Sequence, residues 1–257
     1  MLLAVDVGNT HMVLGLFQGE KLRCDWRIQT SRGTTVDELA ARLHGLFQLR
    51  NLHFEQVTGL IIGSVVPPLE TIWSGLARKY LSCEAMQVKG KNLDTGVAVV
   101  TDNPDEVGAD RIINSAAAFA RYKKPLIIVD FGTAITLDCV SSRGEYIGGA
   151  IAPGLGISFD ALINQTSKLP RINISIAPEK PIGTNTETAL RSGLLYGFGG
   201  LVEGLVLQMM HQFAPLTPKV IATGGMAGVI APYAPSIESV EPMLTLEGLR
   251  IIHERNS

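Results

Sequence analysis

Two short turns in this sequence each place an aspartate and a glycine at the end of an apolar run. The first is Asp6-Val7-Gly8-Asn9-Thr10, and the second is Asp130-Phe131-Gly132-Thr133. A glycine lets the backbone come close to a phosphate and offers its N–H as a donor, while amide and hydroxyl side chains add further donors. The aspartate can hold a hydrated Mg²⁺ or another cation that offsets phosphate charge. One copy alone is typical of an ordinary hairpin turn, but two copies favour a pair of phosphate-binding turns.

The elements around the two turns repeat in the same order. Each turn follows an apolar strand and precedes a strand-turn-strand meander, and one more buried strand comes later in each half. The predicted strands are Leu2–Val7, Met12–Phe17, Lys21–Ile28 and Leu60–Val66 in the first half, and Leu126–Val129, Ile135–Val140, Tyr146–Ile151 and Val220–Ala222 in the second. This repetition predicts an α/β chain made of two halves with related topology.

Helical spacing separates these strands. Thr35–Leu49 carries apolar residues on one stripe, and Leu69–Tyr80 has a similar pattern. The halves join near 103–124, where Asn103 and Glu106 match a capping box and Ala109–Tyr122 is typical of a longer helix. We expect a helix at this join to form the base of a cleft between the two halves.

The segment Gly108-Ala109-Asp110-Arg111 sets a carboxylate beside a guanidinium in the first turn of that helix. Asp110 could accept a proton from a substrate hydroxyl, and the planar fork of Arg111 suits a carboxylate or a phosphate. An aspartate that stabilises a helix N-terminus beside a solvated arginine has the same pattern. The residues alone leave both interpretations open.

Three further segments are rich in glycine or hydroxyl groups. Gly224-Gly225 follows a buried strand and could admit an adenine ring, although taken alone it favours an ordinary strand-to-helix turn. Gly148–Gly154 could line a ligand or form a tight bend, and Gly183–Glu187 is typical of a helix start capped by Thr184 or Thr186.

Composition narrows the class of protein. Hydrophobic residues make up 46% and charged residues 18% of 257 residues, which excludes a disordered chain and leaves material for a sizeable core. The net charge is −2 without a dense basic run, so we expect no nucleic-acid partner.

The sequence lacks a P-loop and a G-x-S-x-G motif. Its three cysteines are widely spaced, as in a reduced cytoplasmic protein. Leu194–Met210 is apolar but contains Glu203, so a core or interface helix is expected rather than a membrane span.

Taken in order, these segments resemble the type III pantothenate kinases, within the superfamily of acetate and sugar kinases, heat-shock chaperone ATPases and actin. The resemblance covers nearly the whole chain and rests on the ordered series rather than on one motif. The series is Asp6–Thr10, Asp102-Asn103-Pro104, Gly108–Arg111, Asp130–Ala134, Gly148–Ile151, Pro153-Gly154, Asn185-Thr186 and Thr223–Gly225.

The resemblance implies an α/β fold of two ribonuclease-H-like domains around an ATP cleft. The two domains would be copies of one mixed five-stranded sheet flanked by helices. We expect these domains at 1–115 and 116–257, and a cytoplasmic homodimer with no membrane partner. The implied reaction is ATP-dependent phosphorylation of pantothenate at its primary hydroxyl to 4'-phosphopantothenate, the first step towards coenzyme A.

The resemblance also implies roles for single residues. ATP would be bound by Asp6, Val7, Gly8, Asn9, Thr10, His11, Met12, Val13 and Thr133. Pantothenate would be bound by Gly108, Ala109, Asp110, Arg111 and Thr186, with Asp110 as the proton acceptor. Asp130 would ligate an activating monovalent cation, K⁺ or NH₄⁺, and Mg²⁺ would accompany ATP. Many relatives carry an aromatic residue where this chain has Thr101, a departure that bears on substrate affinity more than on the reaction.

Other functions are open to the same fold. One is a kinase of another small hydroxy acid or sugar, and another is a non-catalytic ATP-binding regulator, because fold alone does not fix function. An actin-like polymer subunit is disfavoured, because the chain lacks large insertions and carries the Asp110-Arg111 pair.

Overall fold

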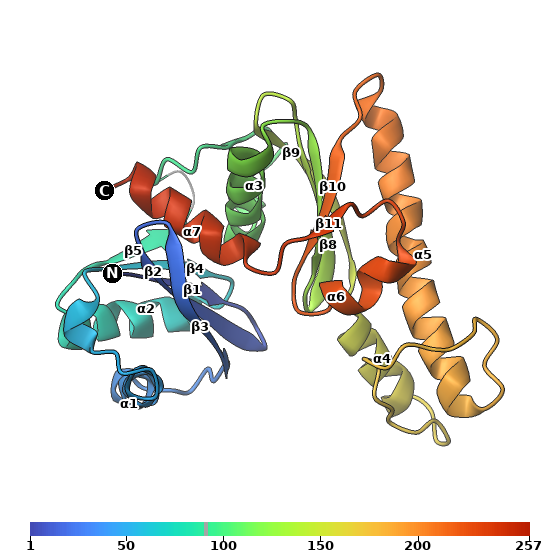
Figure 1. The fold of residues 1–257 in the computed structure, drawn as a ribbon, viewed down its shortest axis with the longest axis horizontal. Coiled ribbons are helices and arrows are strands. Elements are labelled where there is room, and N and C mark those ends of the chain that lie inside the picture. Colours follow the sequence, from blue (N-terminus) through green and yellow to red (C-terminus); the bar gives the residue numbers. More distant parts are fainter. Residues whose placement is uncertain (90–91) are drawn as a thin grey trace. The chain divides into compact units, whose positions relative to one another are not determined.

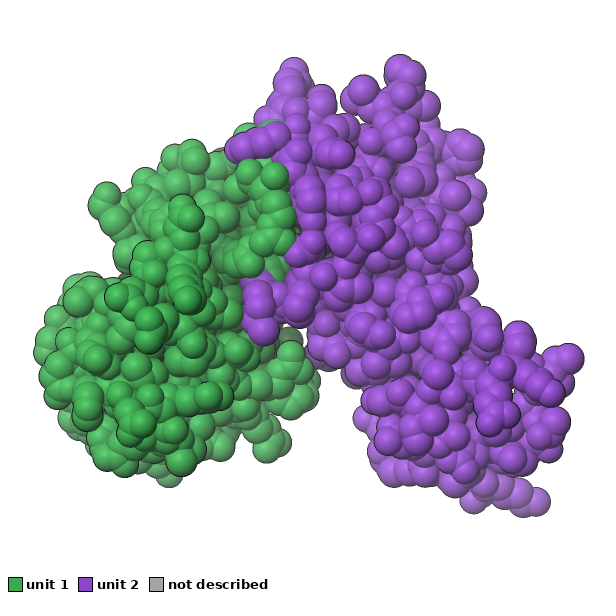
Figure 2. All heavy atoms as spheres, in the orientation of Figure 1, with its two compact units in different colours: residues 1–121, 244–257 green, residues 122–243 purple. Residues whose placement is uncertain are grey.

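The computed structural model describes residues 1–89 and 92–257. The chain forms two compact units, coloured separately in Figure 2. Unit 1 comprises residues 1–121 together with 244–257, and unit 2 comprises residues 122–243. Each unit is described by itself below.

Unit 1 is built on a five-stranded sheet with the strand order β3-β2-β1-β4-β5. Its strands are β1 (Leu2–Val7), β2 (His11–Gln18), β3 (Lys21–Gln29), β4 (Gly59–Ser64) and β5 (Ala85–Val88), with a further short strand β6 (Ala98–Val99) in the same unit. The first three form an antiparallel meander, whereas β4 and β5 run parallel to β1. The central strands β1 and β4 are almost entirely buried and read as continuous apolar runs, as strands covered on both faces do.

Helices supply the crossovers that the parallel strands of unit 1 require. The crossover helices are α1 (Val36–Gln48) and α2 (Pro67–Leu76), the latter followed by the π-turn η2 (Ala77–Leu81). The unit also contains the helices α3 (Ala109–Tyr122) and α7 (Leu244–Arg255) and the short 3₁₀ turns η1 (Phe54–Gln56) and η3 (Pro104–Glu106). Thr35 and Glu38 form a capping box that fixes the start of α1. The predicted stripe of α1 is buried, and Phe47 on this stripe stacks on Trp26 at 5.2 Å between ring centroids.

Unit 2 repeats this topology, with the strands in the order β11-β10-β7-β8-β9. Figure 1 shows the strands of this unit beside its long helix over Thr186–Phe213. Its strands are β7 (Leu126–Phe131), β8 (Ala134–Val140), β9 (Glu145–Pro153), β10 (Lys219–Thr223) and β11 (Ser239–Val240). Its helices are α4 (Leu155–Asn164), α5 (Thr186–Phe213), α6 (Ala227–Ile230) and the 3₁₀ turn η4 (Ala231–Tyr233). As in unit 1, a meander comes first and the later strands run parallel to its first strand. The predicted fold class, α/β with two mixed sheets flanked by helices, is therefore confirmed.

Unit 1 ends at residue 121 and also contains the last helix, α7, whereas the domains at 1–115 and 116–257 remain a prediction. A Cβ built on Gly248 of α7 would lie 2.3 Å from the carbonyl oxygen of Ile113 in α3, so the backbones of the two helices approach closely at this glycine. Helix α7 also lies against β1 and β4. This packing joins residues far apart in the sequence, and no local pattern indicates it.

The capping box expected at Asn103 is wrong. Asn103 precedes the short 3₁₀ turn η3 without a side-chain cap, and its carbonyl oxygen accepts a hydrogen bond from the N–H of Glu106 at 3.2 Å. Helix α3 starts later, at Ala109, as predicted.

Candidate active site

The first aspartate-glycine turn connects β1 to β2 in unit 1. The N–H of Gly8 donates to the carbonyl oxygen of His11 at 3.0 Å, which closes the turn. A Cβ at position 8 would come within 2.9 Å of that oxygen, so the turn needs glycine. Asn9, Thr10 and His11 are exposed and Asp6 is half-buried. Their side chains and N–H groups are therefore placed to meet a ligand.

Two of the residues expected to bind ATP are buried. Val7 and Met12 are fully buried in the core of unit 1, so only their backbone groups can face a nucleotide. Within the segment from Asp6 to Val13, the exposed side chains are those of Asn9, Thr10 and His11.

Residues 30–32, which follow β3 and are called the strap below, hold this turn in place. The N–H of Thr30 donates to the carbonyl oxygen of Thr10 at 3.0 Å, and its hydroxyl donates to the carbonyl oxygen of Gly8 at 2.7 Å. Arg32 donates from Nη2 to Oδ1 of Asn9 at 3.1 Å. The sequence-based reasoning missed these residues, although the predicted antiparallel pairing of β2 with β3 brings Gln29 opposite His11 and could have pointed to them.

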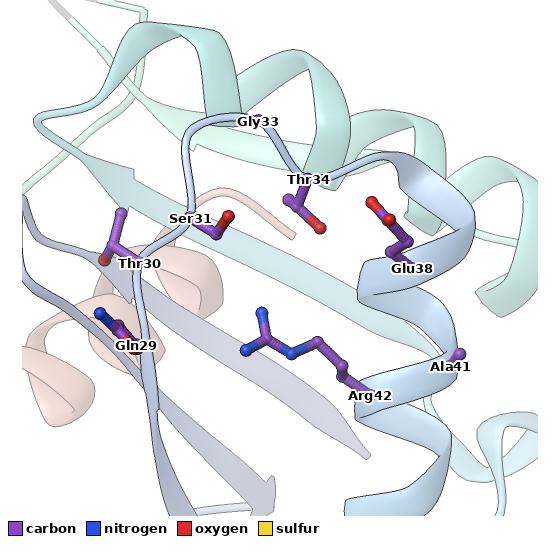
Figure 3. A pocket seen from close by; sticks show the side chains of 8 residues that line it. All are labelled: Gln29, Thr30, Ser31, Gly33, Thr34, Glu38, Ala41 and Arg42. Atoms are coloured by element: carbon purple, nitrogen blue, oxygen red, sulfur yellow. The ribbon is translucent and has the colours of Figure 1, made fainter.

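A cavity of about 650 Å³ lies beside the strap, and its lining side chains are shown in Figure 3. The guanidinium of Arg42 extends from α1 into this cavity towards Gln29 and Ser31. The lining residues are Gln29, Thr30, Ser31, Gly33, Thr34, Glu38, Ala41 and Arg42. Thr30 therefore borders both the cavity and the turn.

Asp110 stands in the first turn of α3. Its Oδ1 accepts a hydrogen bond from the N–H of Arg111 at 2.9 Å. Burial raises the pKa of the Asp110 carboxyl above its usual value, while the N–H and the positive charge of Arg111 act in the opposite direction. A carboxylate with a raised pKa is a better proton acceptor than an exposed one, so the environment suits a general base. Arg111 is half-buried rather than solvated, which disfavours the purely structural interpretation of the pair.

Gly108 allows Asp110 to take this position. A Cβ at residue 108 would lie 2.6 Å from Oδ1 of Asp110. The carbonyl oxygen of Gly108 also accepts from the N–H groups of Arg111 and Ile112, at 3.2 and 3.4 Å, which starts the helix. The glycine and the aspartate are thus parts of one local arrangement.

The second aspartate-glycine turn connects β7 to β8 in unit 2. The N–H of Gly132 donates to the carbonyl oxygen of Ala134 at 3.0 Å. The N–H of Gly154 donates to the carbonyl oxygen of Thr133 at 3.1 Å. Gly224 lies against the same turn, because a Cβ there would be 2.4 Å from Oδ1 of Asp130. Gly224 has a φ of +92°. Close packing against Asp130, together with the positive φ, therefore explains why residue 224 is a glycine.

Thr186 is the first residue of α5 in unit 2. The cap of this helix is neither Thr184 nor Thr186, as had been expected, but Asn185, whose Oδ1 accepts from the N–H of Thr188 at 2.9 Å. Thr186 is exposed and is not the capping side chain. The expected pantothenate-binding residues therefore belong to both units, with Gly108–Arg111 in unit 1 and Thr186 in unit 2.

The duplicated sheet with an aspartate-glycine turn after the first strand of each copy is the fold that the resemblance to acetate and sugar kinases, chaperone ATPases and actin predicts. Among solved structures, component A of (R)-2-hydroxyglutaryl-CoA dehydratase from Acidaminococcus fermentans has a similar fold. It matches with a TM-score of 0.55 at 12% identity, covering 98% of this chain and 95% of that one. This similarity concerns the fold alone.

Closer similarities identify the family. The model of the family "Type III pantothenate kinase" matches residues 2–208. The type III pantothenate kinase of Geobacter sp. (strain M21) is 49% identical over 256 residues, covering 100% of both chains. That of Moorella thermoacetica is 45% identical over 257 residues, again covering 100% of both. This chain belongs to the type III pantothenate kinase family.

Proposed function

We propose that this chain transfers the γ-phosphoryl group of ATP to the primary hydroxyl of pantothenate, giving 4'-phosphopantothenate and ADP. The observation that carries this proposal is the family match, because the matched residues 2–208 include Asp6, Asp110 and Asp130. The buried carboxylate at the start of α3 supplies the acceptor for the hydroxyl proton that this reaction requires.

The reaction is an in-line displacement at phosphorus. The pantothenate oxygen forms a bond to the γ-phosphorus while the bond to the β–γ bridging oxygen breaks, and ADP leaves with that electron pair. Phosphoryl transfer has a loose transition state, so positioning and charge stabilisation dominate over proton removal. Asp110 takes the hydroxyl proton late, on the carboxylate oxygen that does not accept from Arg111, and also orients the hydroxyl.

The residues assigned to pantothenate are Gly108–Arg111 and Thr186. The guanidinium of Arg111 binds the carboxylate of pantothenate through its planar fork. Gly108 and Ala109 are assigned backbone contacts with pantothenate, and Thr186 a hydroxyl contact. The hydroxyl oxygen of Thr101 is buried and has no hydrogen-bond partner among residues 1–89 and 92–257. It would form a polar part of the wall of the pocket.

The residues present fit cations that accompany phosphates rather than a protein-enclosed metal. Among the described residues, no group of three or more His, Cys, Asp and Glu side chains could hold a metal ion. Mg²⁺ keeps several waters and binds through one or two carboxylates plus substrate phosphates, which suits Asp6. Asp130, a half-buried carboxylate surrounded by backbone at Gly132 and Gly224, suits K⁺ or NH₄⁺. Both cations would offset phosphate charge.

The reaction is tested by ADP release. We expect turnover with ATP and pantothenate, and faster turnover when K⁺ or NH₄⁺ replaces Na⁺, because Asp130 then has its cation. A panel of small hydroxy acids and sugars under the same conditions is the control. Turnover with another acceptor in the panel but not with pantothenate would contradict the assigned substrate, and ATP binding without turnover on any acceptor would indicate a regulator.

Helix α5 supports the proposed homodimer. One face packs within unit 2, where Gly199 lies against Tyr233 and Glu203 accepts from the N–H and hydroxyl of Ser236 at 2.9 and 2.7 Å. The exposed residues between positions 193 and 208 are mostly apolar or small. They are Gly193, Tyr196, Gly197, Gly200, Leu201, Gly204, Leu207 and Gln208. The four glycines among them have open space around them, so a helix of a second copy could approach closely.

By length and composition alone α5 could cross a membrane. Its inner face instead packs on its own unit, and the proposed location of the protein is the cytoplasm.

Leu207→Glu is expected to convert the dimer to a monomer, because a charge would be buried in the helix contact. Light scattering after size exclusion measures the mass. Leu216→Glu is the control, since Leu216 is 50% and Leu207 47% exposed, and Leu216 lies outside the helix. If the Leu207→Glu and wild-type masses are the same, the assigned interface is wrong.

A further inference from the structure

The phosphate turn of unit 1 lacks a cation of its own. Residues 1–20, which include β1, the turn and β2, contain neither lysine nor arginine. A nucleoside triphosphate brings about four negative charges to a turn that already carries the carboxylate of Asp6. Backbone and hydroxyl donors are neutral, so a positively charged side chain from elsewhere in unit 1 would add to the charge that the proposed cations supply.

Arg32 is held at this turn by two contacts. Thr30 fixes the chain two residues earlier, because its N–H and hydroxyl bind the carbonyl oxygens of Thr10 and Gly8, at 3.0 and 2.7 Å. The Arg32 side chain then reaches Asn9, with 3.1 Å between Nη2 and Oδ1. The guanidinium is thus tied to the most exposed part of the turn although Arg32 and Asn9 are 23 residues apart in the sequence.

The chemistry of the guanidinium suits a polyphosphate. It carries five N–H donors in a planar fork, and the hydrogen bond to Asn9 uses one of them. An arginine can bind two phosphate oxygens at once, and the oxygens of the β- and γ-phosphates of ATP offer such acceptors. An exposed side chain such as Arg32 is also free of the desolvation cost that a buried arginine would carry before the ligand arrives.

We propose that Arg32 is a nucleotide-binding residue that contacts the β- and γ-phosphates of ATP, and that Thr30 is the positioning residue that brings Arg32 to the turn. This assignment rests on the proposed function, in which the turn at Gly8 binds the phosphates of ATP. Asn9 serves as the resting partner of the guanidinium and holds it near the phosphate position.

Arg32→Ala tests the contact directly. Loss of charge-assisted hydrogen bonds should raise the Kd for ATP about 10- to 100-fold and leave the Kd for AMP within about twofold. Isothermal titration with ATP, ADP and AMP measures the series. Arg23→Ala is a matched control, because Arg23 is exposed and also donates to a side-chain amide oxygen, that of Gln18, at 3.0 Å. It should bind all three nucleotides as the wild type does.

Two outcomes would overturn the assignment. Arg32→Ala could bind ATP as tightly as the wild type, or it could lose ATP and AMP affinity equally. The titration needs no acceptor substrate. A chain whose ATP affinity depends on Arg32 but which does not phosphorylate pantothenate would therefore contradict the proposed function and leave the role of Arg32 intact.

Thr30 is tested by rescue. Thr30→Val removes the hydroxyl donor to Gly8 and should weaken ATP binding, whereas Thr30→Ser keeps the donor and should restore it. In the double variant Thr30→Val/Arg32→Ala the two losses should not add, because both act through the same guanidinium. Additive losses, or a Thr30→Ser variant as weak as Thr30→Val, would show that Thr30 does not act through Arg32.

Discussion

Asp110→Asn is expected to lower kcat about 10²- to 10⁴-fold while the Kd for ATP changes less than about twofold. The substitution keeps the shape of the side chain and removes the proton acceptor. ADP release at saturating pantothenate measures kcat, and titration with ATP measures binding. Near-normal turnover would rule out Asp110 as the base.

A folding defect can be separated from this loss of chemistry. Burial disfavours the ionised form of Asp110, so a neutral asparagine should leave the thermal unfolding midpoint unchanged or raise it. Asp105→Asn is the matched control, because Asp105 is an exposed aspartate five residues earlier in η3. It should keep wild-type kcat. A lowered midpoint in Asp110→Asn together with reduced ATP binding would indicate a structural role instead.

The pH profile follows from the same carboxyl. Asp110 works as a base only when ionised, so kcat/KM should fall as the pH is lowered and the carboxyl takes up a proton. Since burial raises its pKa, the fall should begin nearer to neutral pH than for an ordinary aspartate. The residual kcat/KM of Asp110→Asn should not show this fall as the pH is lowered.

Gly224→Ala is expected to have the second largest effect, on both stability and activity. The new Cβ would lie 2.4 Å from Oδ1 of Asp130 and 2.7 Å from backbone atoms of Phe131, at a φ of +92°. Overpacking together with a left-handed conformation should lower the free energy of unfolding by about 2–4 kcal/mol. Displacement of the carboxylate should also lower kcat/KM and weaken the response to K⁺. Denaturant unfolding and ADP release measure the two effects.

Gly148→Ala is the control that isolates close packing. Gly148 has a φ of +115° and no atom within 4 Å of its built Cβ, so alanine there meets the conformational cost alone, about 1–2 kcal/mol. Gly148→Ala should therefore retain the K⁺ response. Equal losses of stability in the two variants would mean that the contact with Asp130 does not decide the identity of residue 224.

The sequence by itself determined the local elements and the family. Apolar runs, helical spacing and the two aspartate-glycine turns depend on neighbouring residues, so the meanders and helix α3 could be predicted with nearly the observed bounds. The ordered series of motifs then indicated the family that the comparisons confirmed. The roles of Asp110, Asp130 and Thr186 remain predictions that the proposed experiments test.

Only the tertiary structure decided which distant groups meet. The strap at Thr30 and Arg32 reaches the turn because β3 pairs with β2, and Gly224 meets Asp130 because β10 pairs with β7. The raised pKa of Asp110 depends on how much surrounding chain excludes water from it. Such burial and contacts arise from packing between residues remote in sequence, and therefore no local pattern of residue types specifies them.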